Sequence, residues 1–432
     1  MARDTRKELR NQVMYSVFVR NHSEEGNFEG VRKDLDRIQK LGVDIIWFLP
    51  IHPVGKEKRK GELGSPYAIS DYRAINPEYG TLEDFKRLVQ EIHDRGMKCI
   101  IDVVYNHTSP DSWLAENHPE WFYRKPDGSF GNKVGEWQDV IDLDYTKEAL
   151  WDYQIETLKQ WAKIVDGFRC DVAPLIPLEF WLRARREVAK VRKDCIWLSE
   201  SVEPVFTVDN RARGMISLSD SEIYQAFDIC YEYDVYAWFV GYLTGENTLA
   251  EYAARIQAQE SIYPDNYVKL RFLENHDNSR AGFLVQGEQK LKNWIAFNYF
   301  QKGMTLLYAG EEFGISHLPS LFERDTIEWN TDTDFSAFLA GLYKLKKNPL
   351  MTDSTYRVEA KPNDVLCAVH EKNESKMIGI FSVGGRASLV AVDVAEGVYT
   401  NLLTQKQIEV HRGKVCCDGT PIIFEFTEGR GV

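Results

Sequence analysis

The feature that most constrains the fold is a regular alternation of short apolar runs with amphipathic helical patterns. Eight runs rich in β-branched or aromatic residues have the length of strands: residues 13–19, 45–49, 98–104, 167–171, 196–200, 226–230, 268–273 and 305–308. Helical patterns lie between them, as at residues 82–95, 147–164, 178–191, 249–258 and 289–300. This alternation predicts parallel strands with right-handed crossovers. Eight units over about 340 residues predict an α/β fold, a (β/α)8 TIM barrel.

An open, doubly wound sheet is the structural alternative. It is disfavoured because the first strand-to-helix turn, residues 21–27, contains no GxGxxG phosphate-binding pattern. Two regions interrupt the alternation. Residues 108–145 are rich in aromatic residues, Pro, Gly and Asn, and predict a short insertion after strand 3. From about residue 349 onward, alternating strands predict a C-terminal antiparallel β domain.

These interruptions divide the chain into three expected domains. Residues 1–107 and 146–348 form the catalytic barrel, residues 108–145 an inserted domain, and residues 349–432 a C-terminal β-sandwich. The aromatic residues of the insertion are expected to form a small local core, with one or two of them stacking on a ligand. They are Trp113, Trp121, Phe122, Tyr123, Phe130 and Trp137.

The charge and the N-terminal sequence restrict the partners and the compartment. Lys and Arg total 53 and Asp and Glu total 66, so the net charge of −13 disfavours nucleic acid or an anionic membrane as a partner. The N-terminus carries no secretory signal pattern, and no apolar run is long enough to span a membrane. Seven cysteines without CxxC spacing are expected to be reduced thiols, which favours a cytoplasmic location.

Polar residues follow several of the predicted strands, at the end where barrel active sites form. Asp102 lies near the end of the third strand, Asp171 ends the fourth, Glu200 the fifth, and Asp277 follows the seventh. Because the carboxyl ends of parallel strands meet at one end of a barrel, we expect these carboxylates to converge. A single Asp at such a position is usually a cap or turn residue, but the coincidence at four strand ends favours a catalytic site.

Spacing predicts a role for two of the carboxylates. Arg169 and Asp171 are two residues apart, so on a strand they face the same side. A guanidinium beside Asp171 would keep its carboxylate ionised, as a nucleophile requires. Glu200 follows an apolar strand that contains Trp197. Apolar surroundings raise the pKa of a carboxyl group, which suits a general acid.

At this point the sequence resembles the alpha-amylase family of glycoside hydrolases (family 13 type). Its short motifs occur in order: DVVYNH at residues 102–107, GFRCD at 167–171, WLSE at 197–200 and NHD at 275–277. The segments GVDIIWFLP (42–50) and GMTLLYAGE (303–311) are similar to the second and eighth strands of that family. The segments SPYAISDYRAINPEYG (65–80) and IDLDY (141–145) are also similar to family segments.

The resemblance implies a retaining hydrolase with a covalent glycosyl-Asp intermediate. Asp171 would be the nucleophile, Glu200 the acid and base, and Asp277 the stabiliser of the transition state. The residues that would bind or orient the sugar are Tyr67, His107, Arg169, His276 and, as a weaker match, Arg324. Asp102 would pair with Arg169. The expected substrates are α-1,4-linked maltodextrins and malto-oligosaccharides.

The same carboxylates occur in relatives with other specificities. An oligo-α-1,6-glucosidase or an α-glucan transglycosidase therefore remains the alternative, as does a sugar-binding member without catalysis. No cofactor is expected to be required. Calcium is possible, with Asn106 as a ligand, but Ala173 and Pro174 replace the Lys-His that many amylases carry after the nucleophile. The only partner that the sequence predicts is the oligosaccharide substrate.

Overall fold

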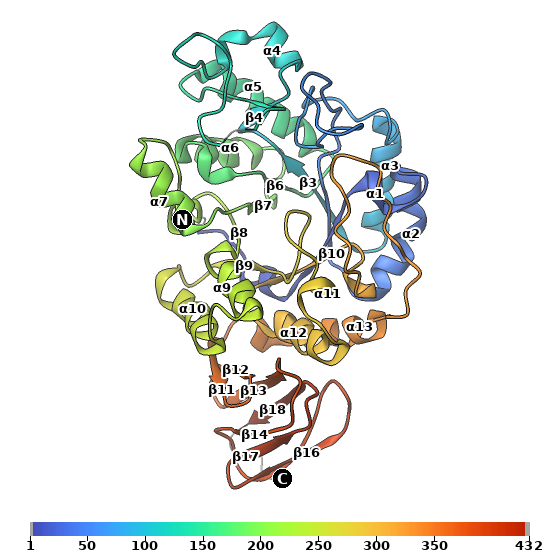
Figure 1. Cartoon of the computed structure of the whole chain (residues 1–432), viewed down its shortest axis with the longest axis vertical. Helices are drawn as coiled ribbons and strands as arrows, with labels where there is room; N and C mark the ends of the chain where they lie inside the picture. The colour runs from blue at the N-terminus through green and yellow to red at the C-terminus, as the bar shows by residue number, and fades with distance from the viewer. Residues whose placement is uncertain (1–2, 136, 428–432) are drawn as a thin grey trace. The chain divides into compact units, whose positions relative to one another are not determined.

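Eight parallel strands close into a barrel in the computed structural model, which describes residues 3–135 and 137–427. The order around the barrel is β1-β10-β9-β8-β7-β6-β3-β2. The strands are β1 (Val13–Val17), β2 (Ile45–Phe48), β3 (Lys98–Val103), β6 (Gly167–Cys170), β7 (Ile196–Ser199), β8 (Ile229–Tyr231), β9 (Val268–Arg271) and β10 (Met304–Tyr308). The predicted (β/α)8 barrel with an antiparallel C-terminal region is confirmed (Figure 1).

The chain forms two compact units. One contains Met14–Tyr231 together with Pro319–Trp329, and the other contains Arg6–Val13, Glu232–Leu318 and the chain from Asn330 onward. Within the first unit the register sets β3 against β6, so that Asp102 lies opposite Arg169, and sets Arg169 opposite Leu198 of β7. The register therefore brings the polar ends of neighbouring strands side by side.

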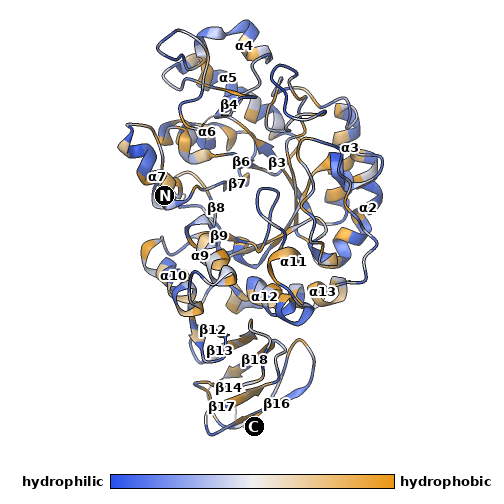
Figure 2. Cartoon of the chain, in the orientation of Figure 1, coloured by the Kyte–Doolittle hydropathy of each residue, from blue (hydrophilic) through white to orange (hydrophobic). Residues whose placement is uncertain are grey.

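Helices follow the barrel strands because their sequences are amphipathic and capped. In α2 (Phe28–Leu41), the side chain of Asn27 accepts a hydrogen bond from the N–H of Gly30 at 3.1 Å, and Gly42 ends the helix at φ 87°. The other long helices of the barrel region, coloured by hydropathy in Figure 2, are α3 (Leu82–Asp94), α5 (Glu148–Trp161), α6 (Leu178–Val188), α9 (Tyr233–Thr244), α10 (Leu249–Ile262), α12 (Glu288–Phe300) and α13 (Ser336–Lys346).

The insertion after β3 is a compact excursion with little regular structure. Two short antiparallel strands, β4 (His107–Thr108) and β5 (Ile141–Asp142), bring its two ends together. Between them lie the helix α4 (Trp113–Asn117) and a short 3-10 turn, Pro119–Trp121. The pairing places His107 opposite Asp142, so the insertion begins beside the end of β3.

The C-terminal region consists of two four-stranded antiparallel sheets. The first has the order β11-β12-β13-β18 and the second β14-β17-β16-β15. Their bounds are β11 (Thr355–Lys361), β12 (Val365–Lys372), β13 (Ser375–Ser382), β14 (Ser388–Ala391), β15 (Gly397–Thr400), β16 (Gln407–His411), β17 (Lys414–Cys417) and β18 (Ile422–Thr427). Buried residues from both sheets, such as Ile380 and Val415, share one hydrophobic core, as in a β-sandwich.

Most of the cysteines are buried, and none of them is in a disulfide. All seven cysteines lie in the described ranges, and six are buried. Burial raises the pKa of the Cys99 and Cys170 thiols well above its ordinary value, so these thiols are unreactive. Across residues 3–135 and 137–427, the helices lack the combination of length and apolar character that crossing a membrane requires.

Candidate active site

A buried arginine at the end of β6 gathers three carboxylates. Arg169 Nη1 lies 2.8 Å from Asp102 Oδ1 and 2.9 Å from Asp171 Oδ1, and its Nη2 lies 3.0 Å from Glu200 Oε2. The side chains of Arg169 and Asp102 are fully buried, whereas those of Asp171 and Glu200 are about one-tenth exposed. One guanidinium thus connects the ends of β3, β6 and β7 and leaves two of the three carboxylates with a path to solvent.

Aromatic rings surround this guanidinium. Its central carbon lies 5.2 Å from the ring centre of Trp47, 5.7 Å from that of Tyr67 and 5.5 Å from that of Tyr231. The Tyr67 hydroxyl also donates to Asp102 Oδ2 at 3.1 Å. Burial alone would lower the pKa of Arg169, but Asp102, Glu200 and the two phenols raise it well above its ordinary value. The cation is therefore permanent, and it stabilises the ionised form of the carboxylates around it.

The residue after Asp171 has an unusual backbone. Val172 has φ 34° and ψ 42°, a left-handed conformation that a β-branched residue rarely adopts and that costs about 1–3 kcal/mol. In this conformation its N–H donates to Glu200 Oε2 at 2.8 Å. The strained turn at Val172, the residue after Asp171, is thus hydrogen-bonded directly to the Glu200 carboxylate. Sequence reasoning missed this contact, because nothing in a valine predicts a positive φ.

His107 lies beside Asp171. Its Nε2 is 4.0 Å from Asp171 Oδ2, and the ring is buried. Burial lowers the pKa of His107, although the nearby Asp142 and Asp139 raise it, so the neutral imidazole is favoured at neutral pH. The Trp137 ring packs against it, with ring centres 5.6 Å apart. The neutral ring can exchange hydrogen bonds with a sugar hydroxyl as donor or acceptor.

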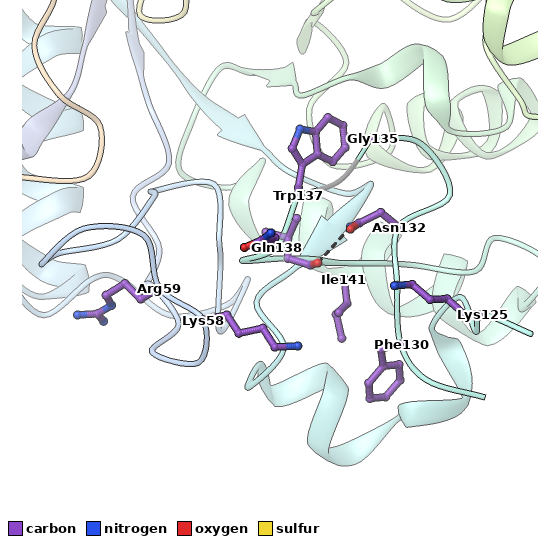
Figure 3. A pocket seen from close by; sticks show the side chains of 11 residues that line it. Lys58, Arg59, Lys125, Phe130, Asn132, Gly135, Trp137, Gln138 and Ile141 are labelled. Carbon is purple, nitrogen blue, oxygen red and sulfur yellow. Dashed lines mark hydrogen bonds between the residues drawn. The ribbon is translucent and has the colours of Figure 1, made fainter. Parts of the chain in front are cut away.

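Trp137 also lines a pocket of about 850 Å³ within the first unit (Figure 3). In Figure 3 the Lys58 and Lys125 side chains point toward each other across this pocket, and Phe130 lies in its apolar part. The Asn132 amide donates to the carbonyl of Val140 at 3.1 Å, which fixes one wall. The pocket extends the site outward from His107 between the loop after β2 and the insertion.

The other aromatic residues of the insertion contact rings of the insertion and of α5. Trp113 stacks on Tyr153 at 5.7 Å, and Trp121 stacks on His118 at 3.8 Å. Phe122 and Phe130 meet edge to face at 5.4 Å. The pair of Phe122 and Phe130 agrees with the expected local core, whereas Trp113 is 42% exposed and packs on α5. Of the six aromatic residues named from the sequence, Trp137 contacts a residue of the candidate site, His107, in the part of the chain that the structure describes.

Asp277 and His276 belong to the second unit, after β9. The His276 ring is buried, and its Nε2 lies 3.0 Å from Asp277 Oδ2, while the Asp277 side chain is 41% exposed. The side chain of Asn275 positions this turn, because its Oδ1 accepts the N–H of Asp277 at 2.9 Å and that of Asn278 at 3.0 Å. Asn275 is thus a positioning residue for Asp277, a role that the sequence analysis did not assign.

The remaining expectations from the sequence meet different outcomes. The structure brings Tyr67, His107, Arg169, Asp171 and Glu200 together in the first unit. Arg324 lies close to the loop that follows β1: its Nη2 would be 3.4 Å from a Cβ placed on Gly26.

The apolar setting expected for Glu200 was wrong. Its carboxylate contacts the guanidinium and a backbone N–H. The Trp197 ring packs instead on Phe168, Trp181 and Phe227, among the aromatic side chains between the barrel and its helices. Because residues two apart share a face of a strand and residues three apart do not, Trp197 and Glu200 point to opposite sides.

The residues around Asn106 fit a calcium ion poorly. Asn106 Oδ1 is buried without a hydrogen-bond partner, as a vacant ligand would be. However, the ammonium of Lys133 donates to the carbonyl of Leu143 at 2.9 Å, and its backbone N–H donates to Asp142 Oδ2 at 2.7 Å. Within the described ranges there is no group of three His, Cys, Asp or Glu side chains that could hold a metal. The Lys133 ammonium also interacts electrostatically with Asp142 and Asp144, which disfavours a second cation near these carboxylates.

Comparison with known families gives a match over nearly the whole chain. The family described as "Alpha amylase, catalytic domain" matches residues 12–349. The family described as "Bacterial Alpha amylase C-terminal domain" matches residues 357–424. The two matches cover the barrel with its insertion and most of the C-terminal sheets.

Two solved structures resemble the chain along its full length. One is an alpha-amylase from Lactobacillus plantarum, with 47% sequence identity and a TM-score of 0.95 over 98% of this chain and 100% of that one. The other is described as a noncanonic maltogenic alpha-amylase, AmyB, from Thermotoga neapolitana, with 31% identity and a TM-score of 0.86 over 97% and 99% of the two chains.

Curated relatives are more distant and longer. Alpha-amylase MalA of Haloarcula japonica is 25% identical over 84% of this chain, which spans 54% of that protein. The alpha-1,4-glucan:maltose-1-phosphate maltosyltransferase of Myxococcus xanthus is 31% identical over 45% of this chain and 33% of its own length. The chain thus spans about half the length of the first of these relatives and a third of the second.

Proposed function

The chain belongs to the alpha-amylase family, and from that membership we propose that it is a retaining glycoside hydrolase of α-1,4-linked gluco-oligosaccharides such as maltodextrins. We further propose that it acts in the cytoplasm, where cysteines that form no disulfide remain reduced. The substrate is neutral, which agrees with a chain of net charge −13 that has no need of a polyanion partner.

The observation that carries the proposal is the single guanidinium that contacts both Asp171 and Glu200. Retaining glycosidases place their two carboxyl groups about 5–5.5 Å apart, whereas inverting enzymes need roughly 6.5–9.5 Å to admit a water molecule. Two carboxylates on adjacent nitrogens of one arginine favour the closer arrangement. One of them then serves as nucleophile while the other transfers the proton.

In the proposed reaction Asp171 attacks the anomeric carbon as Glu200 protonates the departing glycosidic oxygen. The bond from carbon to that oxygen breaks, and an ester bond forms to Asp171. Glu200, now ionised, removes a proton from water, and the hydroxide oxygen displaces Asp171 with overall retention. Arg169 keeps the nucleophile charged and aimed, and Asp277 stabilises the positive charge that develops on the sugar.

A second candidate is glycosyl transfer by the same site, which the similarity to the maltosyltransferases favours. Transfer uses an acceptor hydroxyl instead of water in the second step, so the carboxylates do not separate the two reactions. Product analysis with maltoheptaose, isomaltose and panose does. Shorter maltodextrins alone support hydrolysis of α-1,4 bonds, longer products support transfer, and cleavage of isomaltose with inert maltoheptaose would refute the main proposal.

The residue assignments are tested by Asp171→Asn and Glu200→Gln. Each is nearly isosteric, and we expect turnover of maltoheptaose to fall by roughly 10³-fold or more with the melting temperature little changed. Asp36→Asn is the matched control, because Asp36 is an exposed carboxylate that pairs with Arg95 on the surface. Full activity in Asp171→Asn would contradict the assignment of the nucleophile.

A further inference from the structure

Arg20, in the short helix Val19–His22 that follows β1, joins two loops that are nearly 260 residues apart in the chain. Its Nη1 donates to the carbonyl of Gly64 at 2.9 Å and to that of Leu321 at 3.0 Å, and its Nη2 donates to the carbonyl of Leu63 at 3.3 Å. The arginine is only 3% exposed. A buried guanidinium that donates to both loops fixes their separation, because its donors form a rigid planar fork.

The two loops also bind each other directly. The N–H of Leu63 donates to the carbonyl of Phe322 at 3.0 Å, and the N–H of Glu62 donates to Glu323 Oε1 at 2.9 Å. We call residues 61–64 and 320–323, with Arg20, the loop bridge. All of it lies within the first unit. The bridge joins the loop after β2 to the segment that follows β10.

Glycine allows the close approach of the two loops. Gly61 has φ 66°, and a Cβ added there would lie 2.7 Å from Phe322 Cβ and 2.9 Å from its carbonyl oxygen. Any side chain at this position would strain the backbone and separate the loops. The contact is therefore specified by residue type at position 61 and is not an accident of two flexible loops.

Asn21, the residue after Arg20, fixes the second loop further. Its Nδ2 donates to the carbonyl of Ser320 at 2.8 Å, and its Oδ1 accepts the N–H of Asp325 at 3.1 Å. Its own carbonyl accepts the N–H of Ile327 at 2.9 Å. Four polar contacts of two adjacent residues after β1 thus hold this loop, which makes the bridge rigid.

The order of strands places the bridge across the barrel from Glu200. The strands of the first unit pair in the order β1-β2-β3-β6-β7, and Glu200 follows β7. In a closed barrel of eight strands, the fifth strand lies opposite the first. Arg20 follows β1, and its two loops flank it, so the bridge and the proton donor stand on opposite sides of the barrel mouth.

Because the loop bridge lies opposite Glu200, it lies near one particular end of a bound sugar chain. The acid must lie beside the oxygen that departs, so the reducing-end part of the substrate lies on the side of Glu200. The non-reducing part then extends toward the opposite side. We propose that the loop bridge closes the cleft at the non-reducing end, so that the enzyme removes short units from chain ends and does not cut internally. This inference rests on the proposed function and adds the mode of cleavage.

The direct test compares two maltoheptaosides that differ at the non-reducing end, one free and one blocked by a 4,6-O-ethylidene group, with products followed by chromatography. We expect the wild-type protein to cleave the blocked substrate roughly 10- to 100-fold more slowly, since the added group must be packed against a wall. Equal rates would overturn the closed cleft and would show that the substrate passes the bridge or leaves through the 850 Å³ pocket. Cleavage of neither would refute the proposed function itself.

A variant and its control locate the effect in the bridge. Gly61→Ala adds a Cβ against Phe322, and we expect the ratio of blocked to free cleavage to rise several-fold toward one. Gly128→Ala is the control, because Gly128 has φ 84° and an added Cβ there meets nothing within 4 Å. Glu323→Ala, which removes one surface hydrogen bond, serves if Gly61→Ala does not fold. An unchanged ratio in the folded bridge variant would overturn the assignment.

Discussion

Replacing Arg169 with methionine tests how far one guanidinium supports the whole site. The substitution removes the guanidinium that pairs with the buried Asp102, and breaking a buried pair in this way costs about 3–5 kcal/mol of unfolding free energy. It also removes the contact that aims Asp171 and the one that holds Glu200. Losing a preorganised electrostatic contact of this kind lowers kcat by roughly 10²–10³-fold, or about 2.7–4 kcal/mol.

The pH dependence gives the sharper readout. Without the guanidinium, the crowded carboxylates of Arg169→Met repel one another in a buried site, so their pKa values rise above those of the unfolded chain. Groups with a raised folded pKa stabilise the protein below the unfolded pKa, near 4, and lose that contribution as the pH rises through the folded pKa. The variant should therefore be closest to wild type in stability at acid pH, and the acid limb of its kcat/KM profile should move to higher pH.

Two further variants separate charge from packing. Arg169→Met with Asp102→Asn removes the stranded charge, so urea denaturation should show most of the lost stability regained, while kcat/KM on maltoheptaose stays low. Arg271→Met is the matched control, because Arg271 is a fully buried arginine paired with Glu232 at 2.9 Å. It should lose similar stability without moving the acid limb. A normal pH profile in Arg169→Met, or full activity in the double variant, would refute the reasoning.

Three other predictions follow from single contacts. Lys133→Met removes the donor to the Leu143 carbonyl and should cost about 1–3 kcal/mol of stability, which added calcium should not restore. EDTA should leave the melting temperature of the wild-type protein unchanged, and a lower melting temperature with EDTA would contradict the poor fit to calcium. Burial and the neighbouring carboxylates raise the pKa of Glu311 well above its usual value, so the stability that Glu311 contributes is lost as the pH rises through that pKa. In Glu311→Gln the urea midpoint should therefore fall less with rising pH than in the wild type, and an equal fall in both proteins would disprove this. Trp137→Ala should lower kcat/KM about 2- to 12-fold, because the ring no longer packs beside His107. Trp113→Ala should leave kcat/KM unchanged, because Trp113 is 42% exposed and stacks on Tyr153 of α5; equal effects of the two substitutions would deny Trp137 a role in binding.

The barrel could be predicted from the sequence because its signals are local. Each of the eight strands overlaps a predicted run, although β8 at residues 229–231 begins three residues later than its prediction, and α3 at residues 82–94 differs by one residue from its prediction. The helix α2 was missed, although Asn27 and Gly42 mark its two ends. In the C-terminal region the sequence predicted an antiparallel β domain without fixing all of its strands, and the structure has two sheets of four. Strands such as β15 are short and largely exposed, so they lack the apolar runs that indicate a strand.

The carboxylates could be found because strand ends converge by topology alone, but their surroundings could not. Trp197 suggested an apolar setting for Glu200, yet alternation along β7 turns that ring to the other side of the strand. The contacts of Glu200 come instead from Arg169 and from the strained Val172, one strand away. Residue type predicts neither, because a positive φ at valine exists only where the rest of the fold imposes it.

The contacts of the loop bridge also could not be predicted from residue type, because they join residues far apart in the sequence. They suggest how the specificity of this fold arises. Arg20 and Gly61 carry no motif by which a sequence would reveal their contact with residues 320–323. Their effect depends on the barrel bringing the first, second and eighth loops together, after which a few backbone hydrogen bonds set the shape of the cleft. The chemistry is thus fixed by residues at strand ends that the topology assembles in every such barrel. The mode of cleavage is fixed by loop contacts that can change without touching those residues, which is why the two properties need separate experiments.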